Sequence, residues 1–526
     1  MSRMLRSGAI VSAMTMVSRV LGLARDAIIF HFFPAGGALD AFFVAFRVPN
    51  LLRRMVAEGA FSLAFIPVLA EYKESRSKED LQKLLDHVAG TLSLVLLVIT
   101  IIGMIAAPLL AMIFAPGFMF GDGQQDGTQA DLTANLILIT FPYIFLISLS
   151  AFVSAILNTF QKFAVPAFTP VLLNVALISA VIWWASHFDE PVKALAWGVI
   201  IGGALQLAFQ IPSLMKLGLL PKPNFKRGHE GVKRIMKLMV PALLGSSVAQ
   251  INILINTAIA SLLAAGSISW LYASDRFVEL PLAIIGVAIG VVILPKLSGD
   301  HVNAKTKAFS ETLDWGVRLG LLIALPAMIG LMLLAKPILA TVLANGANSW
   351  TLVEMSSLSL ITYSFGLPAF IMVKVLAPGF YSRQDTKTPV RIGIFAVLSN
   401  IVLSIVIVLP WVKLDFIGPH AGLALATALA GYINAGLLYY QLKKQSIYHS
   451  VTNSKQAWFK DLFRIFIATV VMAIVVFMLN PADAWWQDSE LGQKALKLLM
   501  LVVAAMVGYF ATLFILGVRK KTFTAV

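Results

Sequence analysis

Eight ionisable side chains lie between residues 18 and 62, inside two otherwise apolar stretches. They are five arginines and three acids: Arg19, Arg25, Arg47, Arg53, Arg54, Asp26, Asp40 and Glu58. A charge near the centre of a bilayer costs roughly 2.5–3.5 kcal/mol, so such side chains normally face the interior of a helix bundle or a water-filled cavity. If these stretches cross a membrane, the cluster indicates that a polar, anionic molecule enters the interior of the protein.

The second of the two stretches places most of its charges on one helical face. Their spacings of seven, seven and four residues put them within about 40° of one another on a helix of 100° per residue, and they are Asp40, Arg47, Arg54 and Glu58. Arg53 points away from this face unless Pro49 and Asn50 distort the helix, as proline commonly does. The direction of Arg53 therefore depends on the proline.

Two interpretations of the charges stay open. The first is that they form internal pairs that hold helices in register, which we favour for Asp26, Asp40, Arg47, Arg54, Asp275 and Glu279. The second is a ligand site, which we favour for Arg19, Arg25, Arg53 and Arg276 because arginines outnumber acids in the membrane core. A guanidinium group stays charged and binds phosphate through a two-pronged fork, so converging arginines suit a phosphate or diphosphate.

The composition identifies the elements that must position these residues. The chain has 526 residues, of which 59% are hydrophobic and only 13% are charged, whereas soluble domains have about 25% charged residues. Its apolar runs match the length of a membrane-spanning helix, and we predict an all-α polytopic membrane protein with about fourteen spans. Lysines and arginines gather in alternate connections, which places both termini in the cytoplasm. The absence of cysteine excludes disulfides and thiol catalysis.

An internal repeat organises these spans. The segment AAPLLAMIFAPG at 106–117 matches AKPILATVLANG at 335–346, and Leu39, Ala41 and Pro49 recur 232 residues later. Six spans in each half make this a parallel repeat, with the substrate path expected between the halves. We predict an N-lobe at 1–222, a C-lobe at 223–445 and two further helices at 446–526.

The remaining polar residues of the apolar stretches have structural explanations. Asn174 and Asn400 are expected to form hydrogen bonds between helices, and Asp314 and Arg318, four residues apart, are expected to pair with each other. The sequence contains no Walker A loop, HExxH or GxSxG motif. It therefore predicts a transporter and not an enzyme, with no cofactor, no metal site and no nucleic-acid partner.

Several segments resemble a known family. SRVLGLARD at 18–26, DAFFVAFRVPNLLRRMVAEGAFSLAFIPVLAEY at 40–72 and VLAPGFYSRQDTKTPV at 375–390 are similar to the mouse-virulence-factor family of the multidrug/oligosaccharidyl-lipid/polysaccharide exporter superfamily. The similarity runs from about residue 5 to 445. It implies two six-helix lobes around a central cationic cavity, with the last two helices forming a groove for a polyprenyl tail.

The resemblance also implies a function. Members of this family carry lipid II, the undecaprenyl-diphosphate-linked peptidoglycan precursor, from the cytoplasmic to the periplasmic leaflet of the bacterial inner membrane by alternating access. Membrane lipids and the cell-wall synthesis machinery are the partners that it suggests. The residues that it places along the cavity are Arg19, Arg25, Arg53 and Arg276, together with Ser18, Asp40, Glu58, Ser269, Asp275 and Glu279. The family's sodium site does not carry over, because the helix with Asn400 has no aspartate.

Other functions remain as alternatives. The nearest are a flippase for another polyprenyl-linked glycan and a multidrug/cation antiporter of the same fold, although the antiporter would need a cavity dominated by carboxylates. A membrane enzyme that acts on polyprenyl phosphates would need clustered Asp and His at a membrane face. For a scaffold of the cell-wall machinery, arginines inside the membrane would have no purpose.

Overall fold

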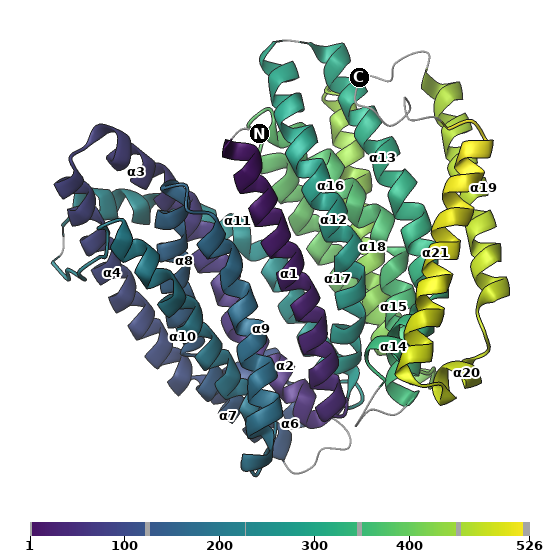
Figure 1. The fold of residues 1–526 in the computed structure, drawn as a ribbon, viewed down its shortest axis with the longest axis horizontal. Helices are drawn as coiled ribbons and strands as arrows, with labels where there is room; N and C mark the ends of the chain where they lie inside the picture. Colours follow the sequence, from purple (N-terminus) through teal and green to yellow (C-terminus); the bar gives the residue numbers. More distant parts are fainter. Residues whose placement is uncertain are drawn as a thin grey trace. The chain divides into compact units, whose positions relative to one another are not determined.

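The computed structural model describes residues 3–120, 127–226, 228–303, 305–344, 350–448 and 454–518. Side chains within 3–10, 12, 56–59, 120, 240–242, 244–249, 284–292 and 454–458 lie outside this description. All regular elements of the described residues are helices (Figure 1). They form two compact units, Met1–Ser269 and Trp270–Val526.

The first unit contains the N-terminal helices and one long helix beyond the predicted lobe boundary at residue 222. Its elements are α1 (Arg3–Phe32), α2 (Gly37–Leu52), the π-helix η1 (Arg53–Phe61), α3 (Ser62–Ser75), α4 (Lys78–Ile105), α5 (Ala107–Phe114), α6 (Gly117–Phe120), α7 (Thr128–Thr140), α8 (Tyr143–Thr159), α9 (Ala164–Trp184), the short 3-10 helix η2 (Ala185–His187), α10 (Lys193–Lys216) and α11 (Glu230–Ser261). The predicted lobe boundaries stay a prediction.

The boundary between the units falls near the start of α12. The elements from there on are α12 (Ser267–Val302), α13 (Thr306–Leu333), α14 (Ala335–Val342), α15 (Trp350–Phe365), α16 (Leu367–Tyr381), α17 (Lys387–Lys413), α18 (His420–Lys444), α19 (Ser454–Leu479), α20 (Asp483–Asp488) and α21 (Leu491–Ile515). The last three follow the repeated part of the chain.

The helices account for the predicted number of spans. Ten helical segments of the described residues are long and apolar enough to cross a membrane. Four more long helical columns are α1, the continuous run α2–η1–α3, α11 and α12. Three of these four, α1, α2–η1–α3 and α12, contain the ionisable residues singled out above. Fourteen columns in the described part of the chain agree with the prediction of an all-α polytopic membrane protein.

The element boundaries repeat between the two halves of the chain. Helix α4 spans 78–105 and α13 spans 306–333, so both ends shift by 228 residues, and α5 and α14 repeat with the same shift. The corners after α8 and α16 also match, because Gln161 and Gln384 have the left-handed φ values of 60° and 61°. The predicted internal repeat is thereby confirmed in helix lengths and in turn geometry.

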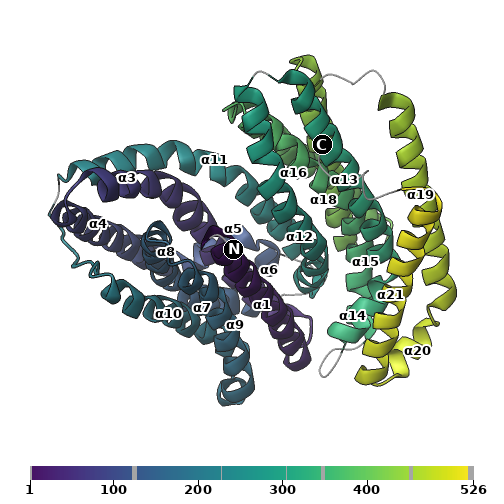
Figure 2. The same cartoon turned by 45° about the horizontal axis from the view of Figure 1, so that its top comes forward.

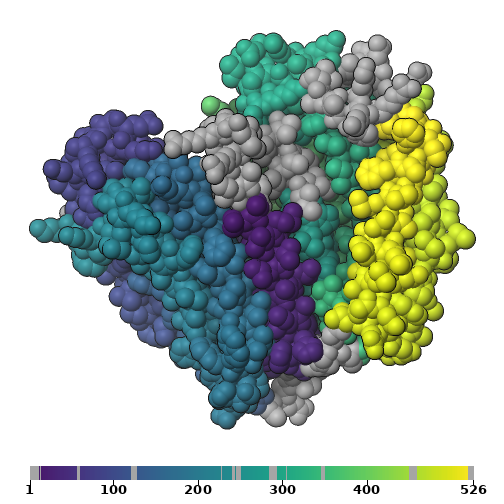
Figure 3. All heavy atoms as spheres, viewed as in Figure 1, coloured from purple at the N-terminus to yellow at the C-terminus, as the bar shows by residue number. Residues whose placement is uncertain are grey.

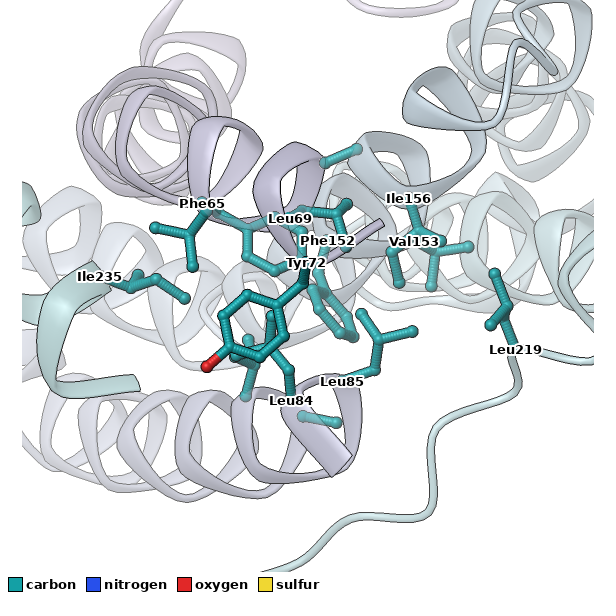
Figure 4. Packing of buried hydrophobic residues seen from close by; sticks show 14 of the residues in the cluster. Phe65, Leu69, Tyr72, Leu84, Leu85, Phe152, Val153, Ile156, Leu219 and Ile235 are labelled. Carbon is teal, nitrogen blue, oxygen red and sulfur yellow. The ribbon is translucent and has the colours of Figure 1, made fainter. Parts of the chain in front are cut away.

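A hydrophobic cluster holds the start of α11 within the first unit. It joins α3, α4 and α8 to α11, and Figure 4 shows Phe65, Leu69, Leu84, Phe152 and Ile235 among its members. Burial of each such side chain contributes about 1.5–3 kcal/mol. An ion pair of 2.7 Å between Arg234 and Glu71 adds to the contact, and both views show α3 and α11 side by side (Figure 2).

The connection between α10 and α11 lies against α4. The backbone N–H groups of Lys222 and Asn224 donate to the Oδ1 atom and the carbonyl of Asp86, at 2.8 and 2.9 Å. A Cβ atom at Gly90 would lie 2.2 Å from the Asn224 carbonyl oxygen, so only glycine permits this close approach. Beyond the connection, burial lowers the pKa of His229, which accepts a hydrogen bond from the Gly231 N–H.

Three polar contacts attach the C-terminal helices to the second unit. Arg318 of α13 donates to Asp461 of α19 at 2.9 Å, the Tyr509 hydroxyl of α21 donates to the Leu322 carbonyl at 2.6 Å, and Lys336 pairs with Asp483 of α20. Helices α19 and α21 lie side by side (Figures 1 and 2). In the space-filling view α21 presents a continuous column of side chains at the surface (Figure 3).

The expected pairing of Asp314 with Arg318 is corrected by these contacts. Arg318 pairs with Asp461, 143 residues further along the chain, and Asp314 accepts a hydrogen bond from the Tyr448 hydroxyl. Both residues have a structural role, as expected. Their partners come from other helices because tertiary packing brings Asp461 and Tyr448 to α13, which spacing along one helix does not reveal.

Candidate functional site

The charges of α1 lie in a buried cluster against α9. Arg25 is 5% exposed and Asp26 is 2% exposed. The guanidinium of Arg25 donates to Asp26 Oδ1 through Nε at 2.9 Å and Nη2 at 2.5 Å, and through Nη1 to Asn174 Oδ1 at 3.0 Å. Asn174 Nδ2 in turn donates to the Ser18 carbonyl at 3.1 Å. The predicted interhelical role of Asn174 is confirmed, and Arg25 forms a charge pair with Asp26.

The other predicted residues of the first helix lie in the same region of α1. Arg19 is half-buried, as is Ser18. Gly22, one turn after Ser18, lies opposite Asn174, whose Nδ2 would be 3.8 Å from an added Cβ. Ser18, Gly22 and Arg25 therefore form the stripe of α1 that faces α9, and Arg19 lies on the neighbouring stripe.

The distortion of the second helix that Arg53 requires is present. Pro49 has no N–H, so the carbonyl of Ala45 lacks its helical donor, and Thr140 Oγ1 of α7 donates to it at 3.2 Å. The π-helix η1 begins four residues after the proline, at Arg53. A π-helix is rare and frequent at functional sites, and here it changes the direction of every residue that follows.

Arg53 has a polar neighbour one turn earlier. Its Nε atom donates to Asn50 Oδ1 at 3.2 Å, and Asn50 Nδ2 donates to the Phe46 carbonyl at 2.9 Å. Arg53 is half-buried and Arg54 is exposed. The side chain of Glu58 lies outside the described residues.

Asp40 and Ser269, predicted as site residues, are brought together by a helix cap. Asp40, which is 1% exposed, accepts the N–H groups of Gly266 and Ser269 at 2.7 Å each and the Ser269 hydroxyl at 2.5 Å. These N–H groups lie at the start of α12, where a helix leaves its first donors unsatisfied and attracts negative charge. A carboxylate on α2 therefore fixes the beginning of α12.

Arg47 makes a second contact between α2 and a distant segment. Its Nη1 atom donates to Thr257 Oγ1 of α11 at 2.5 Å. Asp40 and Arg47, seven residues apart on one face of α2, thus connect this helix to the end of α11 and the start of α12, all within the first unit. Their spacing on one face was correct, and their partners are structural.

The charged turn of α12 presents one oriented arginine. The Arg276 Nη2 atom donates to the Tyr272 hydroxyl at 2.8 Å, and the guanidinium carbon lies 5.0 Å from the centre of the same ring. Glu279 approaches Arg276 at 3.8 Å, longer than a hydrogen bond. Asp275 on this turn is exposed.

The arginines of the candidate site fall into two groups by what holds them. Arg25 is buried and bonded to a carboxylate, whereas Arg53 and Arg276 are half-buried and oriented by the neutral oxygens of Asn50 and Tyr272. A neutral acceptor fixes the plane of a guanidinium without adding a negative charge. Arg53 and Arg276 are therefore suited to bind phosphate oxygens through charge-assisted hydrogen bonds.

The chain matches one known family along most of its length. The family described as "Lipid II flippase MurJ" matches residues 29–492. This chain belongs to the MurJ lipid II flippase family. A probable lipid II flippase MurJ of Vibrio cholerae is 44% identical over 526 residues, which are 99% of this chain and 98% of the relative. The lipid II flippase MurJ of Burkholderia cenocepacia is 40% identical over 98% of this chain and 97% of its own length.

Solved structures share the fold. A lipid II flippase MurJ in an inward closed conformation aligns with a TM-score of 0.79 at 28% identity, covering 96% of this chain and 98% of that chain. An inward-facing multidrug-resistance MATE transporter of the MOP superfamily aligns at 0.67 with 14% identity over 84% of this chain and 98% of that chain. The first match agrees with the family, a family of transporters, and the second shows the common superfamily fold.

Proposed function

We propose that this chain translocates lipid II from the cytoplasmic to the periplasmic leaflet by alternating access. The observation that carries this function is the match to lipid II flippases, which extends over 99% of the chain at 44% identity. The two oriented arginines support it, because the diphosphate is the anionic part of the substrate. The likeness to MATE transporters, at 14% identity, concerns the fold alone.

The proposed substrate site contains the predicted arginines and their neighbours. Arg53 and Arg276 bind the diphosphate directly, with Arg19 and Arg25 as further cationic groups of the same path. Asp40 and Ser269 act by holding the start of α12, the helix that carries Arg276. The remaining proposed members are Ser18, Glu58, Asp275 and Glu279.

The proposed surroundings follow from charge and from the added helices. Lysine and arginine in alternate connections favour a position in the bacterial inner membrane with both termini in the cytoplasm. The apolar helices α19 and α21, attached to α13 and α14, are proposed to shelter the undecaprenyl tail. The cell-wall synthesis machinery, which consumes lipid II, is the proposed partner.

A depletion experiment tests this function. In a strain whose own flippase is depleted, lipid II should accumulate in the cytoplasmic leaflet, and expression of this chain should restore the fraction accessible from the periplasm. Lys413→Ala is a matched control, because Lys413 is an exposed cation at the end of α17. If the chain reaches normal membrane levels and the periplasmic fraction of lipid II stays at the depleted level, the proposed function is wrong.

A further inference from the structure

Asn50 occupies the one polar position between the proline break and the first arginine of the π-helix. We propose that Asn50 is the positioning residue of Arg53: it orients the guanidinium for a diphosphate without offsetting its charge. This inference rests on the proposed function, in which Arg53 binds the diphosphate. Asn50 is assigned no contact with the substrate itself.

The amide of Asn50 is held in one orientation by its own donor. Asn50 Nδ2 donates to the Phe46 carbonyl at 2.9 Å, one turn earlier on α2. With the nitrogen fixed there, Oδ1 is the atom that faces Arg53, and it accepts the Arg53 Nε–H at 3.2 Å. One planar amide thus connects the last regular turn of α2 to the first residue of η1.

A bond to Nε controls the direction of the guanidinium fork. Guanidinium is planar, so fixing Nε and its hydrogen fixes the plane in which both Nη nitrogens lie. A phosphate bound by two parallel N–H groups requires that plane to face it. The Asn50 bond therefore reduces the rotational freedom that Arg53 would lose when the ligand binds.

The neutrality of Asn50 separates this contact from the one at Arg25. Asp26 bonds Arg25 with a full negative charge at 2.5 Å, which offsets the cation. Asn50 provides a carbonyl oxygen of similar reach and no net charge. An orienting residue that keeps the charge on the arginine is what an anion-binding site needs.

Thr140 offers a matched structural control. Both Thr140 and Asn50 donate to carbonyls beside Pro49, the first to Ala45 and the second to Phe46. The printed bonds of Thr140 go to backbone carbonyls of α2 and α7 and none to Arg53. Loss of helix repair and loss of arginine positioning can therefore be measured separately.

The test is a double-mutant cycle on the full-length chain in lipid nanodiscs, with undecaprenyl diphosphate as the probe. Asn50→Ala should weaken binding about 10-fold, the low end for a hydrogen bond to a charged group. In an Arg53→Ala background the same change should have no further effect on affinity. Thr140→Val should lower the melting temperature and leave the affinity unchanged.

Two outcomes overturn the inference alone, and a third separates it from the proposed function. If Asn50→Ala weakens binding equally in the Arg53→Ala background, or lowers only the melting temperature as Thr140→Val does, Asn50 is a structural residue. If Arg53→Ala itself binds the probe normally, the role of Arg53 in the proposed function is wrong, and the positioning role of Asn50 is wrong with it.

Discussion

Each unit of this protein contains one arginine held by a carboxylate and one oriented by a neutral oxygen. Arg25 and Arg318 pair with Asp26 and Asp461, whereas Arg53 and Arg276 bond Asn50 and Tyr272. The first pair connects or stiffens helices, and the second presents guanidinium groups from distorted or charged turns. The comparison shows that an arginine inside a membrane protein is assigned a role by its acceptor and not by its charge alone.

The largest effect is expected at the buried carboxylate of α1. Asp26→Ala leaves Arg25 buried without that charge, and breaking a buried pair from one side costs about 3–5 kcal/mol. We expect loss of folded protein from the membrane, measured by membrane levels and by melting in detergent. The double change Arg25→Leu with Asp26→Leu should recover much of the level. A stable Asp26→Ala protein would remove the distinction between the two kinds of arginine.

A smaller loss of stability is expected at the cap of α12. Asp40→Ala removes the acceptor of three hydrogen bonds and should cost roughly 3 kcal/mol, the size of one or two bonds to a charged group. Ser269→Ala removes one of them and should have about half the effect. Melting curves of the two variants check the order. Equal melting temperatures for wild type and Asp40→Ala would contradict the cap.

The second unit provides the counterpart of Arg25. Sequence spacing suggested a mild effect for Arg318→Ala, but its pairing with Asp461 now predicts a cost of about 2 kcal/mol through weaker attachment of α19. The readout is protease sensitivity of the segment that joins α18 to α19. Asp461→Ala should reproduce the effect, and lipid II headgroup binding should stay unchanged in both. Reduced headgroup affinity would place Arg318 with the oriented arginines instead.

The counterpart of Asn50 should show the smallest effect. Tyr272→Phe keeps the ring beside Arg276 and removes only the hydroxyl that accepts Nη2. Loss of one such bond is worth about 1 kcal/mol, or roughly 5-fold in affinity. We expect weaker undecaprenyl diphosphate binding at an unchanged melting temperature. A lower melting temperature with normal binding would make Tyr272 a structural residue.

Regularities along one helix were predictable from the sequence. The helical class, the repeat and the shared face of Asp40 and Arg47 follow from composition, spacing and period, and Asn174 was recognised as a polar residue inside an apolar helix. The left-handed turns at Gln161 and Gln384 were not foreseen, although their positions follow the repeat. These properties depend on residues close in sequence.

Partners from distant segments were not predictable. Asp40 caps a helix that begins 227 residues later, and Arg47 bonds Thr257, 210 residues away. The π-helix at Arg53 was foreseen only as a condition, because proline frees a carbonyl but tertiary donors such as Thr140 decide how the chain responds. Asn50 was noted beside the proline, and its bond to Arg53 required the geometry of η1.

The central claim is that the two oriented arginines bind the diphosphate of lipid II during transport. The measurement is lipid II in the periplasmic leaflet per molecule of chain in the membrane, in a flippase-depleted strain that carries Arg53→Ala or Arg276→Ala. Each change removes charge-assisted bonds worth about 1.5–3 kcal/mol, so transport should fall roughly 10- to 150-fold at normal membrane levels. Normal transport by both variants at normal levels would contradict the account.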